Sequence, residues 1–216
     1  MPDFNPLDLV IKIAVLLIAI IGHEIMHGLV ALKYGDTTAK FAGRLSINPI
    51  KHIDIFGSIL LPLGLFLLNA PFLFGWAKPV PVDIRRVIEN GDYNGAIAVS
   101  LAGIAYNLCL ALIATILLRT FFSGELQGFS VIVAYFLMLC IIYNVVLAVF
   151  NLLPIPPLDG SQAVGYLSLK FGSDKIPLFF NKIERFGILI LMAILFFGAQ
   201  FLTVPISALI KLFMGV

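Results

Sequence analysis

The sequence predicts an all-α polytopic membrane protein: a transmembrane helix bundle with a short membrane-associated β-hairpin and a re-entrant segment. Of its 216 residues, 61% are hydrophobic and only 12% are charged, whereas a soluble domain carries about 25% charged residues. Its apolar residues form several runs near the roughly 20 residues that a helix needs to cross a bilayer. We therefore expect one integral membrane domain over residues 1–216.

The first apolar run, residues 6–33, predicts a membrane helix. Gly35 and Asp36 follow as a helix cap and turn. The chain starts with the acidic residues Asp3 and Asp8 and has no basic segment before the apolar run. A cleaved signal peptide would begin with basic residues, so we expect this helix to be retained.

Between residues 38 and 47 the apolar period changes to two, which is typical of a strand. Phe41 and Leu45 would face one way, and Lys40 and Arg44 the other. This pattern predicts a strand or short hairpin beside the membrane.

Residues 55–74 form an apolar run long enough to span, interrupted by Pro62 and Gly64. Basic residues flank it on both sides, including Lys51 and Lys78. Because basic loops stay in the cytoplasm, we expect the segment to dip into the membrane, bend at Pro62 and Gly64, and return. A full crossing is the alternative.

The rest of the chain alternates between apolar helices and proline-rich breaks. In order, we expect an extended stretch at residues 75–82, helices at 93–122 and 130–150, a break at 151–160, a short amphipathic helix to about 171, and a last apolar run from about 186, interrupted at Pro205. Lys and Arg cluster after the first helix and before the last one, whereas residues 123–129 contain none. The clusters should be cytoplasmic and the loop external.

Three residues of the first helix carry chemistry: His23, Glu24 and His27, in the order His-Glu-Ile-Met-His. Histidines four positions apart lie on one helix face and can bind one Zn²⁺ ion, while the glutamate can act as general base. Ionisable residues inside a bilayer are costly and are typical of functional sites. The pattern predicts a zinc site within the membrane, towards its cytoplasmic side.

A catalytic zinc ion takes three protein ligands and a water molecule. Asp159 is the candidate third ligand, because it follows a proline-rich break that can turn a carboxylate into the bundle. A loop cap or surface turn is the alternative for this residue.

Two separated motifs resemble the site-2 protease family of intramembrane zinc metalloproteases. They are His23-Glu24-x-x-His27 and Asn151-x-x-Pro154-x-Pro156-x-Leu158-Asp159-Gly160, and residues 100–107 are similar to the small-residue helix motif between them, except that Ile104 replaces the usual proline. The resemblance implies one Zn²⁺ per chain on His23, His27 and Asp159, with Glu24 as base. It also implies cleavage of transmembrane protein substrates within the lipid bilayer, and a place for Asn151 near the scissile bond. A cap for the broken helix end is the alternative role of Asn151.

Two further residues are weaker candidates for substrate contact. Asn107 belongs to a small helix face, so close helix packing is its alternative role. His52 lies at the entry to the segment 55–74 and could instead fix a loop. Residues 39–47 and 78–82 could each pair with an unwound substrate as an edge strand.

The sequence also sets limits and alternatives. A membrane zinc-binding protein without enzymatic activity, or a zinc transporter, is the competing function, but a transporter usually carries ionisable residues along a path across the bilayer. No basic stripe with aromatic residues suggests nucleic-acid binding. We expect a multi-pass protein of a bacterial or archaeal cell membrane, and the sequence does not indicate its oligomeric state, its substrate's identity or its partners.

Overall fold

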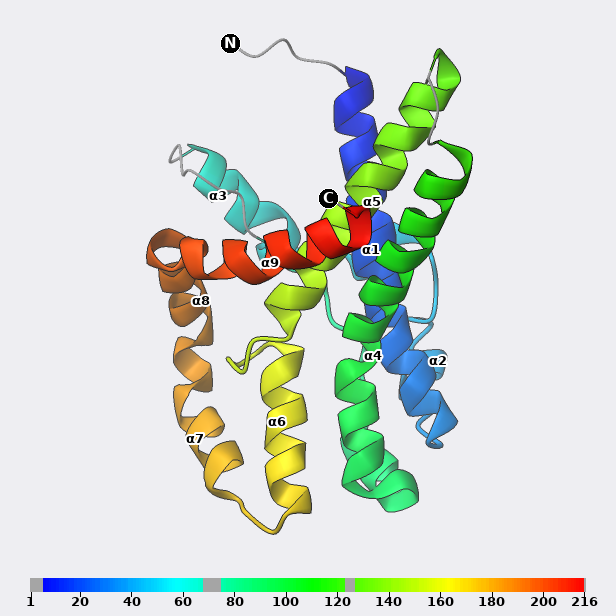
Figure 1. The fold of residues 1–216 in the computed structure, drawn as a ribbon. Helices are drawn as coiled ribbons and strands as arrows, with labels where there is room; N and C mark the ends of the chain where they lie inside the picture. The colour runs from blue at the N-terminus through cyan, green and yellow to red at the C-terminus, as the bar shows by residue number, and fades with distance from the viewer. Residues whose placement is uncertain (1–5, 68–74, 123–126, 216) are drawn as a thin grey trace.

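A computed structural model describes residues 6–67, 75–122 and 127–215 (Figure 1). Within these residues three helices are long and apolar enough to cross a membrane: α1 (Pro6–Lys33), α4 (Ile84–Phe121) and α5 (Phe129–Asn151). The predicted class, an all-α membrane protein, is confirmed. The first helix has the predicted bounds, and α5 differs from its predicted range by one residue at each end.

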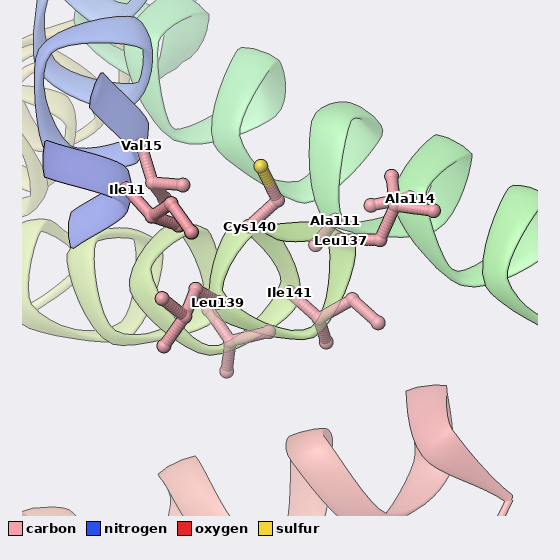
Figure 2. Packing of buried hydrophobic residues seen from close by; sticks show 9 residues of the cluster. Ile11, Val15, Ala111, Ala114, Leu137, Leu139, Cys140 and Ile141 are labelled. Atoms are coloured by element: carbon pink, nitrogen blue, oxygen red, sulfur yellow. The ribbon is translucent and has the colours of Figure 1, made fainter. Parts of the chain in front are cut away.

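These three helices share an apolar core (Figure 2). Its members are Ile11 and Val15 from α1, Ala111 and Ala114 from α4, and Leu137, Leu139, Cys140, Ile141 and Val145 from α5. The two alanines on α4 let the helix backbones approach closely, which is how helices associate in lipid. This packing holds α1 against α4 and α5 on the N-terminal side of its histidines.

The predicted hairpin is wrong, because the described residues contain no strand. Thr38–Phe41 instead forms a short helix, α2, and the carboxylate of Asp36 accepts a hydrogen bond from the Thr38 N–H at 2.9 Å. Gly43 then adopts a φ of +63°, a left-handed conformation that ends regular structure. A period of two over a few residues fits such a helix and turn as well as it fits a strand.

The segment that begins at residue 55 also differs from expectation. A short 3-10 helix, η1 (Pro49–His52), leads to a π-helix, η2 (Ile55–Leu60), and then to α3 (Leu61–Leu67). The predicted bend at Pro62 and Gly64 is wrong, since α3 runs through both residues. Pro62 is the second residue of α3 and follows the π-helix closely, so its missing N–H falls where the helical hydrogen-bond pattern changes. Residues 68–74, where a return would have to occur, lie outside the described residues.

Residues 75–82, which we call the strap, form neither helix nor strand and lie beside the start of this segment. The Trp76 N–H donates to the Gly57 carbonyl oxygen at 3.2 Å, and the Lys78 N–H donates to the His52 carbonyl oxygen at 2.9 Å. The Arg44 guanidinium donates to the Lys78 carbonyl oxygen at 2.7 Å. The chain before and after residues 55–74 is therefore held together.

Helix α4 starts earlier than predicted. Asp83 caps it by accepting a hydrogen bond from the Arg85 N–H at 3.2 Å, and Asp92, with a φ of +49°, breaks the helix just before the predicted start at Tyr93. The turns before this break carry Arg85, Arg86 and Glu89, and they also bury Val87 against Ala31.

The C-terminal third consists of α6 (Asp159–Lys170), α7 (Lys175–Ile183), the 3-10 turn η3 (Glu184–Phe186), α8 (Gly187–Phe197) and α9 (Ala199–Met214). The axis turns by 77° between α8 and α9, so α9 crosses the bundle (Figure 1). Pro205 lies inside α9, and the interruption predicted there falls instead at Gly198. Glycine costs more in a helix than other residues except proline, which favours a break at that position.

The two basic clusters lie at one end of the molecule. The Lys170 ammonium donates to the Asn94 side-chain oxygen at 2.6 Å, joining the end of α6 to the start of α4. Figure 1 shows the end of α1, the start of α4 and the turn between α6 and α7 at the same end. This arrangement agrees with a shared membrane side for both clusters, and the side itself stays a prediction.

Candidate metal centre

His23, His27 and Asp159 meet in the bundle, although the aspartate is far from the histidines in sequence. Asp159 Oδ2 lies 3.0 Å from His23 Nε2 and 3.3 Å from His27 Nε2. One possible ligand atom from each residue falls within 4.8 Å of the others. His23 is buried and the other two are partly buried, so this cluster is largely shielded from solvent.

Local structure explains how each side chain reaches the cluster. The histidines stand one turn apart on the same face of α1, as predicted. Asp159 is the first residue of α6, directly after the proline-rich break that ends α5. A side chain on Gly160 would collide with the backbone of Leu152 and Leu153, so only glycine lets the break fold closely over the start of α6.

The hydrogen-bond partner of Nδ1 fixes the tautomer of each imidazole ring. His27 Nδ1 lies 2.7 Å from the Val99 carbonyl oxygen, and His23 Nδ1 lies 2.7 Å from the side-chain oxygen of Asn107. Both partners are oxygens that can only accept, so both Nδ1 atoms carry the hydrogen and donate. In the neutral rings, each Nε2 is then left with a lone pair directed at Asp159.

This set of atoms fits a zinc ion. Asp159 Oδ2 is buried and receives no hydrogen bond within the described residues. Two bare nitrogens and a carboxylate oxygen would repel one another unless a cation or proton lay between them. In a tetrahedral zinc site with bonds of about 2.0–2.1 Å, ligand atoms lie about 3.3 Å apart, close to the separations here. Two histidines and one carboxylate are a ligand set typical of hydrolytic zinc enzymes.

Glu24 stands beside the two histidines. Its Oε2 accepts a hydrogen bond from the Val80 N–H of the strap at 2.8 Å. A cavity of about 400 Å³ adjoins it, lined by residues of α1, the strap, α5 and α8 that include His23, Glu24, Ala77, Pro79 and Asn151. Glu24 and the zinc-ligand candidate His23 therefore line the same cavity, which offers space for a substrate.

The structure places Asn151 on this cavity, at the end of α5. Its side-chain nitrogen donates to the Leu147 carbonyl oxygen at 3.0 Å. The carboxamide nitrogen carries two hydrogens, so one remains to donate toward the cavity. The position is compatible with both roles that the sequence left open.

The other two candidates lie away from the cavity as far as the structure describes its lining. His52 is buried, and its Nε2 donates to the Ser46 carbonyl oxygen at 2.8 Å. Asn107 has no exposed surface and sits behind His23. This placement favours a loop-fixing role for His52 and a supporting role for Asn107 over substrate contact.

Three features of the site escaped the sequence analysis. Gly103 provides space for the His23 ring, because a Cβ there would lie 2.5 Å from the ring atoms Cε1 and Nε2. Asn144 contacts Asn107, and Val80 contacts Glu24. A polar residue within an apolar helix is costly, so Asn144 carried a signal, whereas the backbone donor of Val80 carried none.

Known proteins resemble this chain in sequence. The model of peptidase family M50 matches residues 124–195, which include Asp159. YwhC of Bacillus subtilis, a protein named as an inferred zinc metalloprotease, is 40% identical over 165 residues, or 74% of this chain and 71% of the relative. The chain belongs to peptidase family M50, the site-2 protease family.

Two more relatives bear the same kind of name. MJ0611 of Methanocaldococcus jannaschii is 32% identical over 166 residues, covering 76% of this M50 protein and 73% of the relative. Rip2 of Mycolicibacterium smegmatis is 31% identical over 155 residues, covering 72% of this chain and 56% of the relative. No solved structure matches the chain significantly. This M50 protein is a multi-pass membrane zinc metalloprotease.

Proposed function

We propose that this M50 protein is an intramembrane endopeptidase that cleaves peptide bonds in or near transmembrane segments of other membrane proteins. His23, His27 and Asp159 hold the zinc ion, and Glu24 is the general base. Three acceptor atoms, from His23 and His27 on the membrane helix α1 and from Asp159 on α6, converge beside Glu24 and a cavity. This observation carries the proposal.

The residues divide the work of hydrolysis. Zinc held by the three side chains supplies a Lewis acid that lowers the pKa of a water molecule and polarises the peptide carbonyl. Glu24 removes a proton from the water as its oxygen bonds to the carbonyl carbon, and then gives that proton to the amide nitrogen as the carbon–nitrogen bond breaks. The free N–H of Asn151 can stabilise the negative charge that develops on the carbonyl oxygen.

A substrate helix must unwind before its peptide bond becomes accessible, and the strap offers new hydrogen-bond partners. The N–H groups of Trp76, Lys78 and Val80 already donate to Gly57, His52 and Glu24. In extended chain, alternate residues face opposite ways, so the backbone of Ala77 and Pro79 points to the other edge. Both residues line the cavity. An unwound substrate would pair with this edge by strand addition.

The site faces the cytoplasmic side of a cell membrane in this proposal. His27 is about 9 Å along the helix from Lys33, given a rise of 1.5 Å per residue. Lys33 begins the first basic cluster, and the positive-inside rule places such a cluster in the cytoplasm. The contacts between the strap and residues 52–57 support a segment 55–74 that enters and returns on that side.

Substitution of the base tests the proposal. The Glu24→Gln variant, purified in detergent, should bind zinc like the unaltered protein and should lose cleavage of a transmembrane peptide by at least about 100-fold. Glu89→Gln, an exposed glutamate on α4, should change neither property. Unchanged cleavage in Glu24→Gln would refute the assigned base. Zinc flux into vesicles that persists without any peptidase activity would favour a transporter.

A further inference from the structure

The ring of His23 is oriented by a carboxamide from the next helix. Asn107 on α4 has no exposed surface, and its Oδ1 lies 2.7 Å from His23 Nδ1. The Asn107 nitrogen faces two acceptors, the Ala19 carbonyl oxygen at 3.2 Å and Asn144 Oδ1 at 2.7 Å. Turning the amide over would place its oxygen against both acceptors, so the nitrogen must face them and the oxygen must face His23.

Asn144 on α5 is fixed in the same way. It is also fully buried, and its nitrogen donates to the Cys140 carbonyl oxygen at 2.8 Å. Its own oxygen is thereby directed to Asn107. A single order of donors and acceptors therefore runs from Cys140 through Asn144 and Asn107 to His23, crossing from α5 to α4 to α1.

We propose that Asn144 is a positioning residue for the metal centre, acting through Asn107 and without contact with zinc or substrate. The order of donors leaves Asn107 with only an oxygen to offer His23. That oxygen requires a hydrogen on His23 Nδ1 and keeps the Nε2 lone pair free for the ion. The inference rests on the proposed zinc ligands and adds that the third membrane helix controls one of them.

A packing role alone explains less of this arrangement. A buried polar residue in lipid can satisfy itself within its own helix, as Thr115 on α4 does by donating to the Ala111 carbonyl oxygen at 2.8 Å. Within its own helix Asn144 satisfies only its nitrogen, which donates to the Cys140 carbonyl oxygen. Its oxygen accepts the hydrogen bond that orients Asn107. Groups that orient metal-binding histidines typically contribute about 10- to 100-fold to metal affinity.

Zinc affinity, measured by chelator competition on the full chain in detergent micelles, tests the proposal without reference to proteolysis. Asn144→Leu should weaken zinc binding by about 10- to 100-fold. Thr115→Val, which removes another buried polar group from α4, should leave it within about twofold. Asn144→Asp keeps an oxygen that accepts from Asn107 and should retain most of the affinity, whatever its protonation state.

A double substitution separates the relay from general loosening of the bundle. If Asn144 acts through Asn107, the variant with both residues changed to Leu should bind zinc no more weakly than Asn107→Leu alone. Additive losses, or normal affinity in Asn144→Leu, would overturn the relay. Should Asn144→Leu fail to fold, an Asn144→Asp variant as weak as Asn107→Leu would overturn it too. Failure of the unaltered protein to bind zinc through His27 would instead reject the proposed function.

Discussion

The backbone N–H of Val80 donates a hydrogen bond of 2.8 Å to the carboxylate of Glu24, across 56 positions of sequence. The strap is itself held by hydrogen bonds to the backbone of His52 and Gly57. One carboxylate oxygen of Glu24 is thus anchored, and the other, which accepts no hydrogen bond from the described part of the chain, can receive a proton. The strap, which lies between α3 and α4, therefore holds the carboxylate of Glu24, the proposed general base.

Removing this donor should reduce turnover without removing zinc. Val80→Pro deletes the N–H, and a hydrogen bond to a charged group contributes about 1.5–3 kcal/mol, so kcat should fall by about 10- to 100-fold. Val80→Ala keeps the donor and shortens the side chain, and it should retain most of the activity. Steady-state cleavage of a transmembrane peptide, with zinc content measured in parallel, provides the check. Equal kcat values for the two variants would show that the hydrogen bond does not position Glu24.

Gly103 should be intolerant of even one methyl group. A Cβ there would lie 2.5 Å from the ring of His23, which is fixed on its other side by Asn107 and cannot move freely. Gly103→Ala should therefore weaken zinc binding by at least about 10-fold, because orientation of a ligand ring sets metal affinity. At Gly165, whose added Cβ would meet only Pro177 at an ordinary 3.9 Å, the same substitution should have no effect. Isothermal titration with zinc distinguishes the two, and normal binding by Gly103→Ala would contradict the close contact.

Sequence reasoning succeeded where chemistry and spacing coincide. His23, Glu24 and His27 lie within one helical turn, so their mutual placement follows from the helix period alone. Asp159 could be found because an aspartate after a proline-rich break, deep in an apolar chain, has few other uses. The two long apolar runs that became α1 and α5 were equally visible, since their lengths match the bilayer.

It failed where tertiary contacts decide between local alternatives. Residues 38–47 alternate as a strand would, but residues 38–41 are helical. Asp36, which accepts from the distant Asp83 N–H, also accepts from the Thr38 N–H at the start of this helix. Val80 reaches Glu24 through its backbone, which leaves no trace in side-chain patterns. The interruption of the last apolar run fell at Gly198, and α9 continues through the exposed Pro205, an outcome that the pattern of residue types does not decide.

Asp36 should make the stability of the protein sensitive to acid. Its carboxylate is buried and accepts hydrogen bonds from the backbone N–H groups of Thr38 at 2.9 Å and Asp83 at 2.8 Å. Burial alone would raise the pKa of Asp36, but the hydrogen bonds from Thr38 and Asp83 outweigh it and lower the pKa below its ordinary value. A carboxylate with a lowered folded-state pKa stabilises the fold above its unfolded pKa of about 3.9 and loses that contribution as pH falls through the folded value.

Asp36→Asn should accordingly lower the thermal midpoint at pH 7, by an amount corresponding to about 1–3 kcal/mol. The difference from the unaltered protein should shrink as pH is lowered through about 4 and below. Asp174→Asn changes an exposed aspartate with no side-chain cap hydrogen bond and should leave the midpoint unchanged. Thermal unfolding in detergent across pH 3–7 makes the comparison. A difference that stays constant over that range would show that ionisation of Asp36 is not its source.

Labelling of single cysteines should place both ends of the segment 55–74 on the cytoplasmic side. Lys51 and Lys78 are exposed, and the hydrogen bond from the Lys78 N–H to the His52 carbonyl oxygen keeps them near each other. In a background without Cys109 and Cys140, Lys51→Cys and Lys78→Cys should react with an impermeant maleimide only in inverted vesicles. Gln127→Cys, in the predicted external loop, should react in intact cells. If Lys78→Cys instead behaved like Gln127→Cys while Lys51→Cys did not, the segment would cross the membrane and the strap could not adjoin Glu24 as it does here.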